Sequence, residues 1–285
     1  MGLFKYLPDE QLAESIEYFF TLQLDRKEIS YERILPSTAD AFIFNYGTPL
    51  YELRGQRLFK FPQCFIHKID RKARSLKFDQ DVEMVGVIFK TGMVSKFSHV
   101  PLVTSALMNS SEFLVNPSLI FGEEIMRIYE LTKEVDSLSE RIKIVEQFFI
   151  KKKQEIKPGL HLLDKATSEI SESHGRASIS NVSRITNLNT RYLRKLFSTY
   201  VGINPKRYGE IIRVRKALTL MLYEKYSISD AAYALEFYDL AHFNHAFKRV
   251  IGASPKNYFS EKNEINHLFM TPDIDVLEDS SGFSL

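Results

Sequence analysis

The C-terminal half of this chain contains one pattern twice, and the duplication limits the folds open to it. The first copy carries Leu193, Phe197, Gly202, Pro205, Lys206 and Tyr208, which recur 50 positions later as Phe243, Phe247, Gly252, Pro255, Lys256 and Tyr258. Upstream, Ile179, Ser183 and Leu188 match Ile228, Ala232 and Phe237 at an offset of 49. The second copy therefore has one extra residue in a turn. A constant offset indicates one supersecondary motif used twice.

Polar residues predict where two helices begin in the first copy. Ser178 caps a short helix that ends near Thr186, and residues 187–189 form a turn. Asn189 is a favoured N-cap for a second helix, on which one stripe is buried at helical spacing: Leu193, Leu196, Phe197 and Tyr200.

The opposite face of this second helix carries Arg191, Arg194 and Lys195. A short helix, a tight turn and a cationic helix predict a helix-turn-helix unit, whose second helix enters the major groove of DNA. Arg and Lys pair there with O6 and N7 of guanine. The alternative is a surface helix with three exposed cations.

The second copy repeats this design with different side chains. Ser227 or Ser229 caps its first helix, residues 236–239 form the turn, and Asp239 caps the second helix. We expect four buried positions, Phe243, Ala246, Phe247 and Val250. The outward positions are Leu240, Ala241, His242, Asn244, His245 and Lys248.

Residues 205–226 predict a long helix between the two copies, with Pro205 at its first position. We expect Ile212, Ala217, Leu220 and Met221 to face inward and Arg207, Arg213, Arg215 and Lys216 to face outward. Such a helix holds the two recognition helices apart, and one turn of DNA requires a separation of ~34 Å.

The formal net charge of +2 conceals a strong asymmetry. Residues 1–150 carry −3, residues 151–260 carry +10, and residues 261–285 carry −5. A basic segment between two acidic ones favours an anionic partner for that segment, although charge alone also fits a solvated basic face. On DNA, phosphate contacts would fall to Lys206, Arg207, Arg213, Arg215, Lys248 and Lys256.

The N-terminal part reads as a small β-rich domain. Short runs at 41–46, 57–61, 64–69 and 82–89 are rich in β-branched and aromatic residues and are separated by Pro, Gly and Asp. They predict an antiparallel sheet of barrel or sandwich type. For residues 4–24 we expect a helical or mixed segment, because Leu12, Ile16, Phe19 and Phe20 have helical spacing after Asp9, a candidate N-cap.

Residues 99–155 predict helices with two apolar stripes. One comprises Ile120, Ile125, Ile128 and Leu131, and the other comprises Leu138, Ile142, Val145 and Phe149. The second stripe is shorter than two heptads, so we expect it to pack on the sheet, with a dimer seam as the alternative.

The predicted fold class is α+β, divided into three segments. A β-rich N-terminal domain with flanking helices covers 1–153, and an all-α domain of two helix-turn-helix units joined by a long helix covers 154–262. We place the boundary at 151–159, where a cationic run ends a helix and Pro158-Gly159 stops it. The acidic segment 263–285 is expected to be disordered, and contact with the basic domain is the alternative.

Several function classes find no support in the residues. The single cysteine fits a reducing compartment, and no apolar run reaches the ~20 residues of a membrane span, so we expect a cytoplasmic protein. Cys64 and His67 stand three apart on a predicted strand and therefore point to opposite faces. We expect no enzyme, no cofactor and no metal.

Residues ~160–260 resemble the DNA-binding domain of AraC-type transcriptional regulators. The resemblance rests on N-x-x-x-L-x-x-L-F through G-I-N-P-K-R-Y (189–208), R-V-R-K-A-L (213–218), I-x-D-A-A-x-A-L (228–235) and F-x-D-L-A-H-F-N-H-A-F-K-R through G-A-S-P-K-N-Y (237–258). It implies base-reading side chains at Arg191, Arg194, Lys195, Leu240, Ala241, Asn244 and His245. The N-terminal part resembles, less specifically, the β-rich domain that precedes this domain in some such regulators.

Three positions depart from the family pattern. Ser183 replaces the usual alanine, Glu236 replaces a turn glycine that often has a positive φ, and His245 stands where many relatives have arginine. We therefore expect the first unit to dominate sequence discrimination.

The resemblance implies a regulator of transcription, by analogy an activator, whose partners are double-stranded DNA and RNA polymerase. A small-molecule effector at the N-terminal domain and a homodimer are further implications. Two alternatives remain: a sequence-indifferent architectural DNA binder, and an enzyme that acts through its N-terminal domain.

Overall fold

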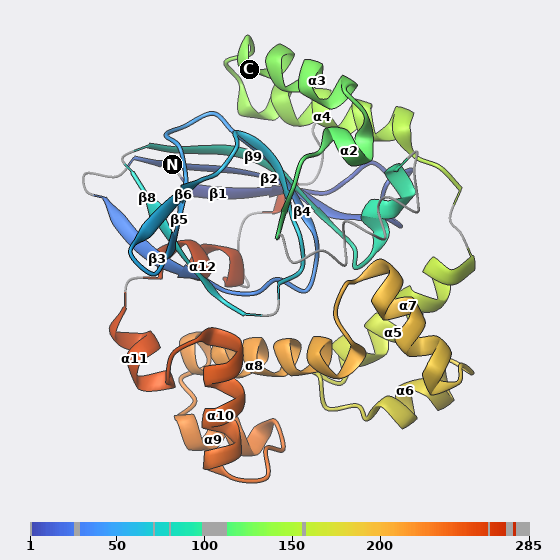
Figure 1. The fold of residues 1–285 in the computed structure, drawn as a ribbon, viewed down its shortest axis with the longest axis vertical. Helices are drawn as coiled ribbons and strands as arrows, with labels where there is room; N and C mark the ends of the chain where they lie inside the picture. Colours follow the sequence, from blue (N-terminus) through green and yellow to red (C-terminus); the bar gives the residue numbers. More distant parts are fainter. Residues whose placement is uncertain are drawn as a thin grey trace.

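The computed structural model describes residues 2–25, 29–70, 72–79, 81–98, 113–155, 158–261, 263–271 and 276–277. A β-rich part with helices on one side lies above a helical part (Figure 1). This arrangement confirms the predicted α+β class. The described strands are β1 Gly2–Tyr6, β2 Ile16–Asp25, β3 Ser30–Ile34, β4 Ala41–Asn45, β5 Tyr51–Arg54, β6 Arg57–Lys60, β7 Cys64–His67, β8 Arg74–Phe78, β9 Asp81–Phe89, β10 Leu114–Val115 and β11 Val276–Leu277.

The strands form two sheets that face each other. One sheet has the order β10-β7-β4-β9-β2-β1-β11 and the other has the order β3-β8-β5-β6. Side chains from both sheets, among them Phe20, Phe65, Leu76 and Phe78, share one apolar cluster. Gly86 of β9 lies under the Phe20 ring, where any Cβ would come within 2.3 Å of its carbons. The domain is thus a sandwich, as the strand spacing predicts.

The expectation of a helical segment at 4–24 is wrong. The segment forms β1, a turn and the long strand β2, which pairs with β9 from Ile16 to Asp25. Asp9 caps no helix, because residues 10–15 form a turn, within which its carboxylate accepts a hydrogen bond from the Gln11 amide (2.8 Å). β2 is central in its sheet and buries side chains on both faces, so its apolar residues do not alternate in a strand pattern.

Helices cover the outer face of the larger sheet. They are the 3₁₀ helix η1 Met93–Phe97 and the helices α2 Ser118–Phe121, α3 Glu124–Lys133 and α4 Leu138–Lys152. Ile142, Val145 and Phe149 of α4 are buried in one cluster with the sheet, which confirms packing of this stripe on the sheet. The other predicted stripe is divided at Gly122 between α2 and α3, and Leu131 remains 52% exposed.

The helical part begins after a short connection. α4 ends at Lys152 with two lysines in its last turn, as predicted. Pro158-Gly159, however, starts the next helix instead of ending the previous one, since proline is tolerated in a first turn. The helices that follow are α5 Pro158–Glu172, α6 Ile179–Ile185, α7 Thr190–Tyr200, α8 Pro205–Tyr223, α9 Ile228–Ala234, α10 Leu240–Ile251 and α11 Pro255–Ser260. No helix in the described part of the chain is long and apolar enough to cross a membrane.

Within the segment after 262, residues 264–270 form a helix and residues 276–277 a strand, which differs from the expected disorder. α12 Glu264–Met270 lies beside β3 and β1, and β11 pairs in parallel with β1. Ile265, Leu268 and Phe269 of α12 pack into the cluster between the two sheets. Burial of these three apolar side chains therefore stabilises a helix in this segment despite its acidic composition. α12 also contacts the helical part, because the Tyr223 hydroxyl of α8 donates to the His267 carbonyl (2.8 Å).

Candidate DNA interface

The first helix-turn-helix unit comprises α6 and α7, and its ends are capped as the sequence predicts. The Asn189 side chain accepts a hydrogen bond from the Tyr192 amide (2.8 Å) and starts α7. Asn187 turns the chain between the helices with φ of 54°. The Ser183 hydroxyl donates to the Leu188 carbonyl, so the serine that replaces the usual alanine fastens this turn.

The outer face of α7 carries the predicted cations. Leu193, Leu196 and Phe197 are buried against the neighbouring helices. On the other face, Arg191, Arg194 and Lys195 are all exposed. Among the described residues no ion pair engages these three, so their charges are available to a partner.

The second unit comprises α9 and α10. Ser227 caps α9 in a reciprocal arrangement with Asp230, and the Asp239 carboxylate accepts from the His242 amide (2.6 Å) at the start of α10. The predicted stripe of Phe243, Ala246, Phe247 and Val250 is buried. Outside it, Leu240, Ala241 and His245 are exposed and Asn244 is half-buried.

The turn of the second unit has a positive φ at Glu236, the position where the family pattern has glycine. Glu236 has φ of 56°, close to the 54° of Asn187 at the matching position of the first unit. A glutamate in the left-handed region is strained, because its Cβ approaches the backbone there. The carboxylate also forms an exposed ion pair with Arg176 (2.6 Å).

The extra residue of the second turn is Tyr238, a candidate contact that sequence reasoning missed. It stands between Phe237 and the N-cap Asp239, and its side chain is 92% exposed. The change of offset from 49 to 50 between the repeats is the signal that marks it. Its phenol therefore lies next to the start of α10, where the predicted base-reading side chains begin.

α8 connects the units, and the structure places its arginines differently from the prediction. Arg213 donates to the Leu235 carbonyl (2.7 Å) and its guanidinium lies 4.0 Å from the Phe237 ring centroid. Arg215 points away from the recognition helices and donates to the Pro36 carbonyl of the N-terminal domain (3.2 Å). Burial lowers the pKa of both guanidinium groups. Their assignment to DNA phosphates is therefore not supported by their positions.

The remaining predicted phosphate residues divide into free and engaged side chains. Lys206, Lys248 and Lys256 are exposed. Arg207 is partly buried, pairs with Glu210 (2.6 Å) and donates to the Arg249 carbonyl (3.1 Å). The three lysines are thus the stronger candidates for backbone contacts.

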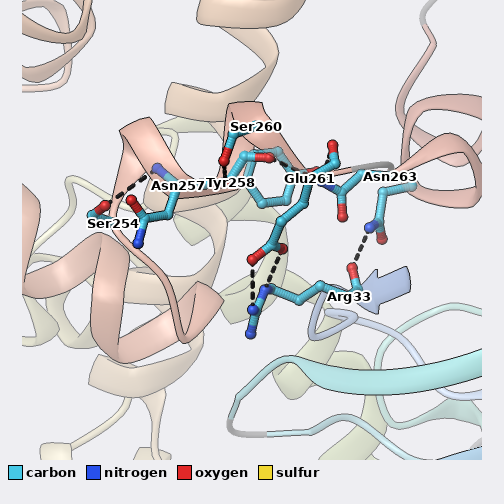
Figure 2. A network of polar contacts seen from close by, with 8 residues as sticks. Arg33, Ser254, Asn257, Tyr258, Ser260, Glu261 and Asn263 are labelled. Atoms are coloured by element: carbon cyan, nitrogen blue, oxygen red, sulfur yellow. Dashed lines mark hydrogen bonds and ion pairs between the residues drawn. The ribbon is translucent and has the colours of Figure 1, made fainter. Parts of the chain in front are cut away.

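The N-terminal domain contacts both units, while the side chains predicted to read bases stay exposed or half-buried. The Thr91 and Tyr208 hydroxyls form a hydrogen bond of 2.9 Å near the first unit, and the Ala73 amide donates to the Val250 carbonyl of the second (2.9 Å). Arg33 forms a two-pronged pair with Glu261 after α11 (2.9 and 2.8 Å), as Figure 2 shows. The two units are therefore held by the domain as well as by α8.

A cavity of about 660 Å³ lies between the two sheets and the helical part. Its apolar walls include Phe20, Phe65 and Phe269, and its polar lining includes His67 and Arg215. Arg215 forms no ion pair with a carboxylate in the described part of the chain. Cys64, by contrast, belongs to the cluster under the helices, so Cys64 and His67 lie on opposite faces of β7 as predicted. No sequence pattern marks this cavity, because it joins residues far apart in the chain.

Two family models match the chain. Residues 182–261 match "Helix-turn-helix domain" and residues 4–110 match "Domain of unknown function (DUF6597)". Among curated proteins, an uncharacterized HTH-type transcriptional regulator YidL of Escherichia coli (strain K12) is 34% identical over 80 residues, which are 28% of this chain and 27% of that protein. The HTH-type transcriptional activator RhaS of Enterobacter sp. (strain 638) is 31% identical over 87 residues, 30% of this chain and 31% of that protein. The chain thus spans less than a third of the length of these relatives.

Two solved structures align with most or part of this chain. ToxT from Vibrio cholerae covers 90% of this chain and 98% of its own, with 14% identity and a TM-score of 0.47. The C-terminal domain of AraT from Geobacillus stearothermophilus covers 39% of this chain and 90% of its own, with 23% identity and a TM-score of 0.34.

Two capped helix-turn-helix units joined by one helix define a DNA-binding domain of the double helix-turn-helix class. Residues 182–261 are a helix-turn-helix domain, similar in sequence to that of the HTH-type transcriptional regulators YidL and RhaS.

Proposed function

We propose that this protein is a sequence-specific DNA-binding regulator of transcription whose α7 and α10 enter successive major grooves. The observation that carries the proposal is the pair of matched, exposed recognition faces at opposite ends of α8 (Figure 1). The 19 residues of α8 span about 28 Å at 1.5 Å per residue, similar to the ~34 Å that separates successive grooves on one face of DNA.

The direction of regulation and the partners follow from the relatives. RhaS proteins are named as transcriptional activators, so we propose activation, with RNA polymerase as the protein partner and the cytoplasm as the place of action. The relatives are named as regulators, and we extend this to propose that the chain is no enzyme.

Selection of bound DNA from a random pool with the full-length protein tests the proposal. We expect one enriched motif with two elements about 10 base pairs apart, bound at least ~10³-fold more tightly than random DNA. Equal affinity for selected and random DNA would instead support an architectural DNA binder. The number of element pairs in the motif also reports whether a monomer or a homodimer binds.

We further propose that the interdomain cavity holds a small-molecule effector with an anionic group and an apolar body. Arg215 supports this assignment, because a guanidinium without a carboxylate partner in apolar surroundings is costly until an anion joins it. Since Arg215 belongs to α8 and Phe20 to β2, a bound ligand would touch both domains.

Decanoate and decanol are suitable probes of the cavity, because they differ only in the head group. Decanoate should raise the melting temperature of the wild-type protein, and decanol should raise it less. Arg215→Met should remove the difference between the two probes. Equal stabilisation of wild type and variant by decanoate would rule out Arg215 as the anion-binding group.

A further inference from the structure

We infer that the two recognition helices read different base pairs, with α7 selecting G·C pairs and α10 selecting an A·T element through thymine methyl groups and adenine. This inference rests on the proposed function and names the chemistry of its DNA target. It begins from the equivalence of the two helices, which allows their side chains to be compared position by position.

The two helices are built alike. Each is preceded by an N-cap residue whose side chain accepts a hydrogen bond from a backbone amide of the first turn, Asn189 for α7 and Asp239 for α10. Each follows a turn with φ near 55°, and Leu193 and Phe243 are fully buried at the same step. Arg191, Arg194 and Lys195 of α7 therefore occupy the same places as Ala241, Asn244 and His245 of α10.

The α7 side chains suit guanine. Arg191 and Arg194 are long, exposed donors one helical turn apart, and Lys195 lies beside them. Guanine is the only base that offers two acceptors, O6 and N7, on its major-groove edge, and arginine can bind both at once. α7 offers no carboxylate or amide between these cations that would select cytosine or adenine.

The α10 side chains suit an A·T element instead. Leu240 is 44% exposed in the first turn and Ala241 beside it is exposed, so an apolar surface leads into the groove. The thymine C5-methyl is the apolar group that a base pair presents there. No group of the described residues forms a hydrogen bond with the Asn244 side-chain amide, which can both accept from adenine N6 and donate to N7.

A matched exchange of side chains tests the assignment. The triple variant Ala241→Arg, Asn244→Arg, His245→Lys gives α10 the outer face of α7. Selection from a random pool should yield one G-containing and one A·T-rich element for wild type. For the variant, the A·T-rich element should become G-containing while the other element is unchanged. Since the three positions are exposed or half-buried, the melting temperature should change little.

Deoxyuridine provides a second readout that needs no variant, because it pairs like thymidine but lacks the methyl group. Replacing one contacted thymidine in the A·T element should weaken wild-type binding about four-fold, the effect of one buried methyl group. Leu240→Ala should bind more weakly and respond less to the same replacement. Deoxyuridine in the spacer between the elements is the control and should have no effect.

The outcomes separate the inference from the proposed function. A selected motif with G·C pairs at both elements, or binding that ignores deoxyuridine, would overturn the inference and leave sequence-specific binding intact. If no motif is enriched at all, both fail. An A·T element that persists in the triple variant would show that α10 does not read it, and would also overturn the inference.

Discussion

Glu236 shows what the second turn requires of a single residue. Its φ of 56° matches that of Asn187, yet asparagine tolerates the left-handed region far better than glutamate. The exposed ion pair with Arg176 offsets little of this strain, since surface pairs contribute about 0–1 kcal/mol. The missing glycine is a sequence signal that correctly predicts the positive φ, because the position is defined by the repeat.

Reciprocal substitutions at the two turns test this strain. Glu236→Asn should raise the free energy of unfolding by about 0.5–1 kcal/mol, and Asn187→Glu should lower it by a similar amount. Chemical denaturation of both variants measures the two effects. A loss of stability in Glu236→Asn would mean that the Arg176 pair outweighs the backbone strain.

Two buried groups of the N-terminal domain should give opposite pH dependences of stability. Burial lowers the pKa of His67 to about 4, so between about 4 and 6.5 the unfolded state binds more protons and stability rises with pH. Burial raises the pKa of Asp40 to about 7, so between about 4 and 7 the folded state binds more protons and stability falls with rising pH.

Melting temperatures of His67→Gln and Asp40→Asn from pH 4 to 7 separate the two contributions. The stability of wild type relative to His67→Gln should increase with pH up to about 6.5. The stability of wild type relative to Asp40→Asn should decrease with pH up to about 7. Asparagine retains an acceptor for the Ile69 amide, which Asp40 binds at 3.1 Å, so this variant mainly removes the titration. Difference curves with the same sign would contradict one of the two assignments.

At the scale of elements, α12 is held to β3 by side-chain hydrogen bonds that the amino-acid composition of the segment does not predict. Asn266 accepts from the Leu35 amide (3.0 Å) and donates to the Arg33 carbonyl. The Ile265 amide donates to the Glu32 carboxylate (2.8 Å). These bonds join positions more than 230 residues apart, so an acidic segment after the DNA-binding domain becomes part of the N-terminal one.

Asn266→Ala should therefore destabilise the protein by about 1–3 kcal/mol, because it leaves two backbone groups without partners in a largely buried place. Asn257→Ala is a matched control on exposed α11 and should change stability by less than about 0.5 kcal/mol. Denaturation midpoints compare the two. Equal effects would mean that α12 is not docked through Asn266.

The helices of the C-terminal part were predictable from sequence because each has a local start signal. Asn189, Asp239 and Pro205 mark three helix starts without reference to distant residues. β2 was not predictable in the same way, since a strand buried on both faces shows no alternation and Ile16 and Phe19 mimic helical spacing. Local chemistry thus predicts capped helices better than central strands.

At the scale of the whole molecule, the cations of the +10 segment fall into two groups, those that contact other parts of the protein and those that are exposed to solvent. Arg215 lines the cavity and Arg213 packs on Phe237, although the sequence predicts that both contact DNA phosphates. For Arg215 the reason is a domain contact across 179 residues, and for Arg213 it is a contact with the turn of the second unit, and periodicity along one helix reports neither. Lys206, Lys248 and Lys256 remain exposed.

The salt dependence of DNA affinity should distinguish these groups. Each of Lys206→Ala, Lys248→Ala and Lys256→Ala should reduce the slope of log affinity against log salt by about 0.9, because one phosphate contact releases about that many counterions. Arg215→Met should leave the slope unchanged. A slope reduced by Arg215→Met but not by the lysine variants would reverse the assignment.

The core of the helical part extends into the N-terminal domain. Leu35, Ile69 and Met93 of the N-terminal domain are buried in the same cluster as Phe197, Val214 and Phe247. If the N-terminal domains of two such regulators were exchanged at the connection after α4, these three side chains would come from a different parent than the rest of the cluster. A stable hybrid would therefore need compensating substitutions around Met93, or a junction that takes both Met93 and the helical side chains of its cluster from one parent.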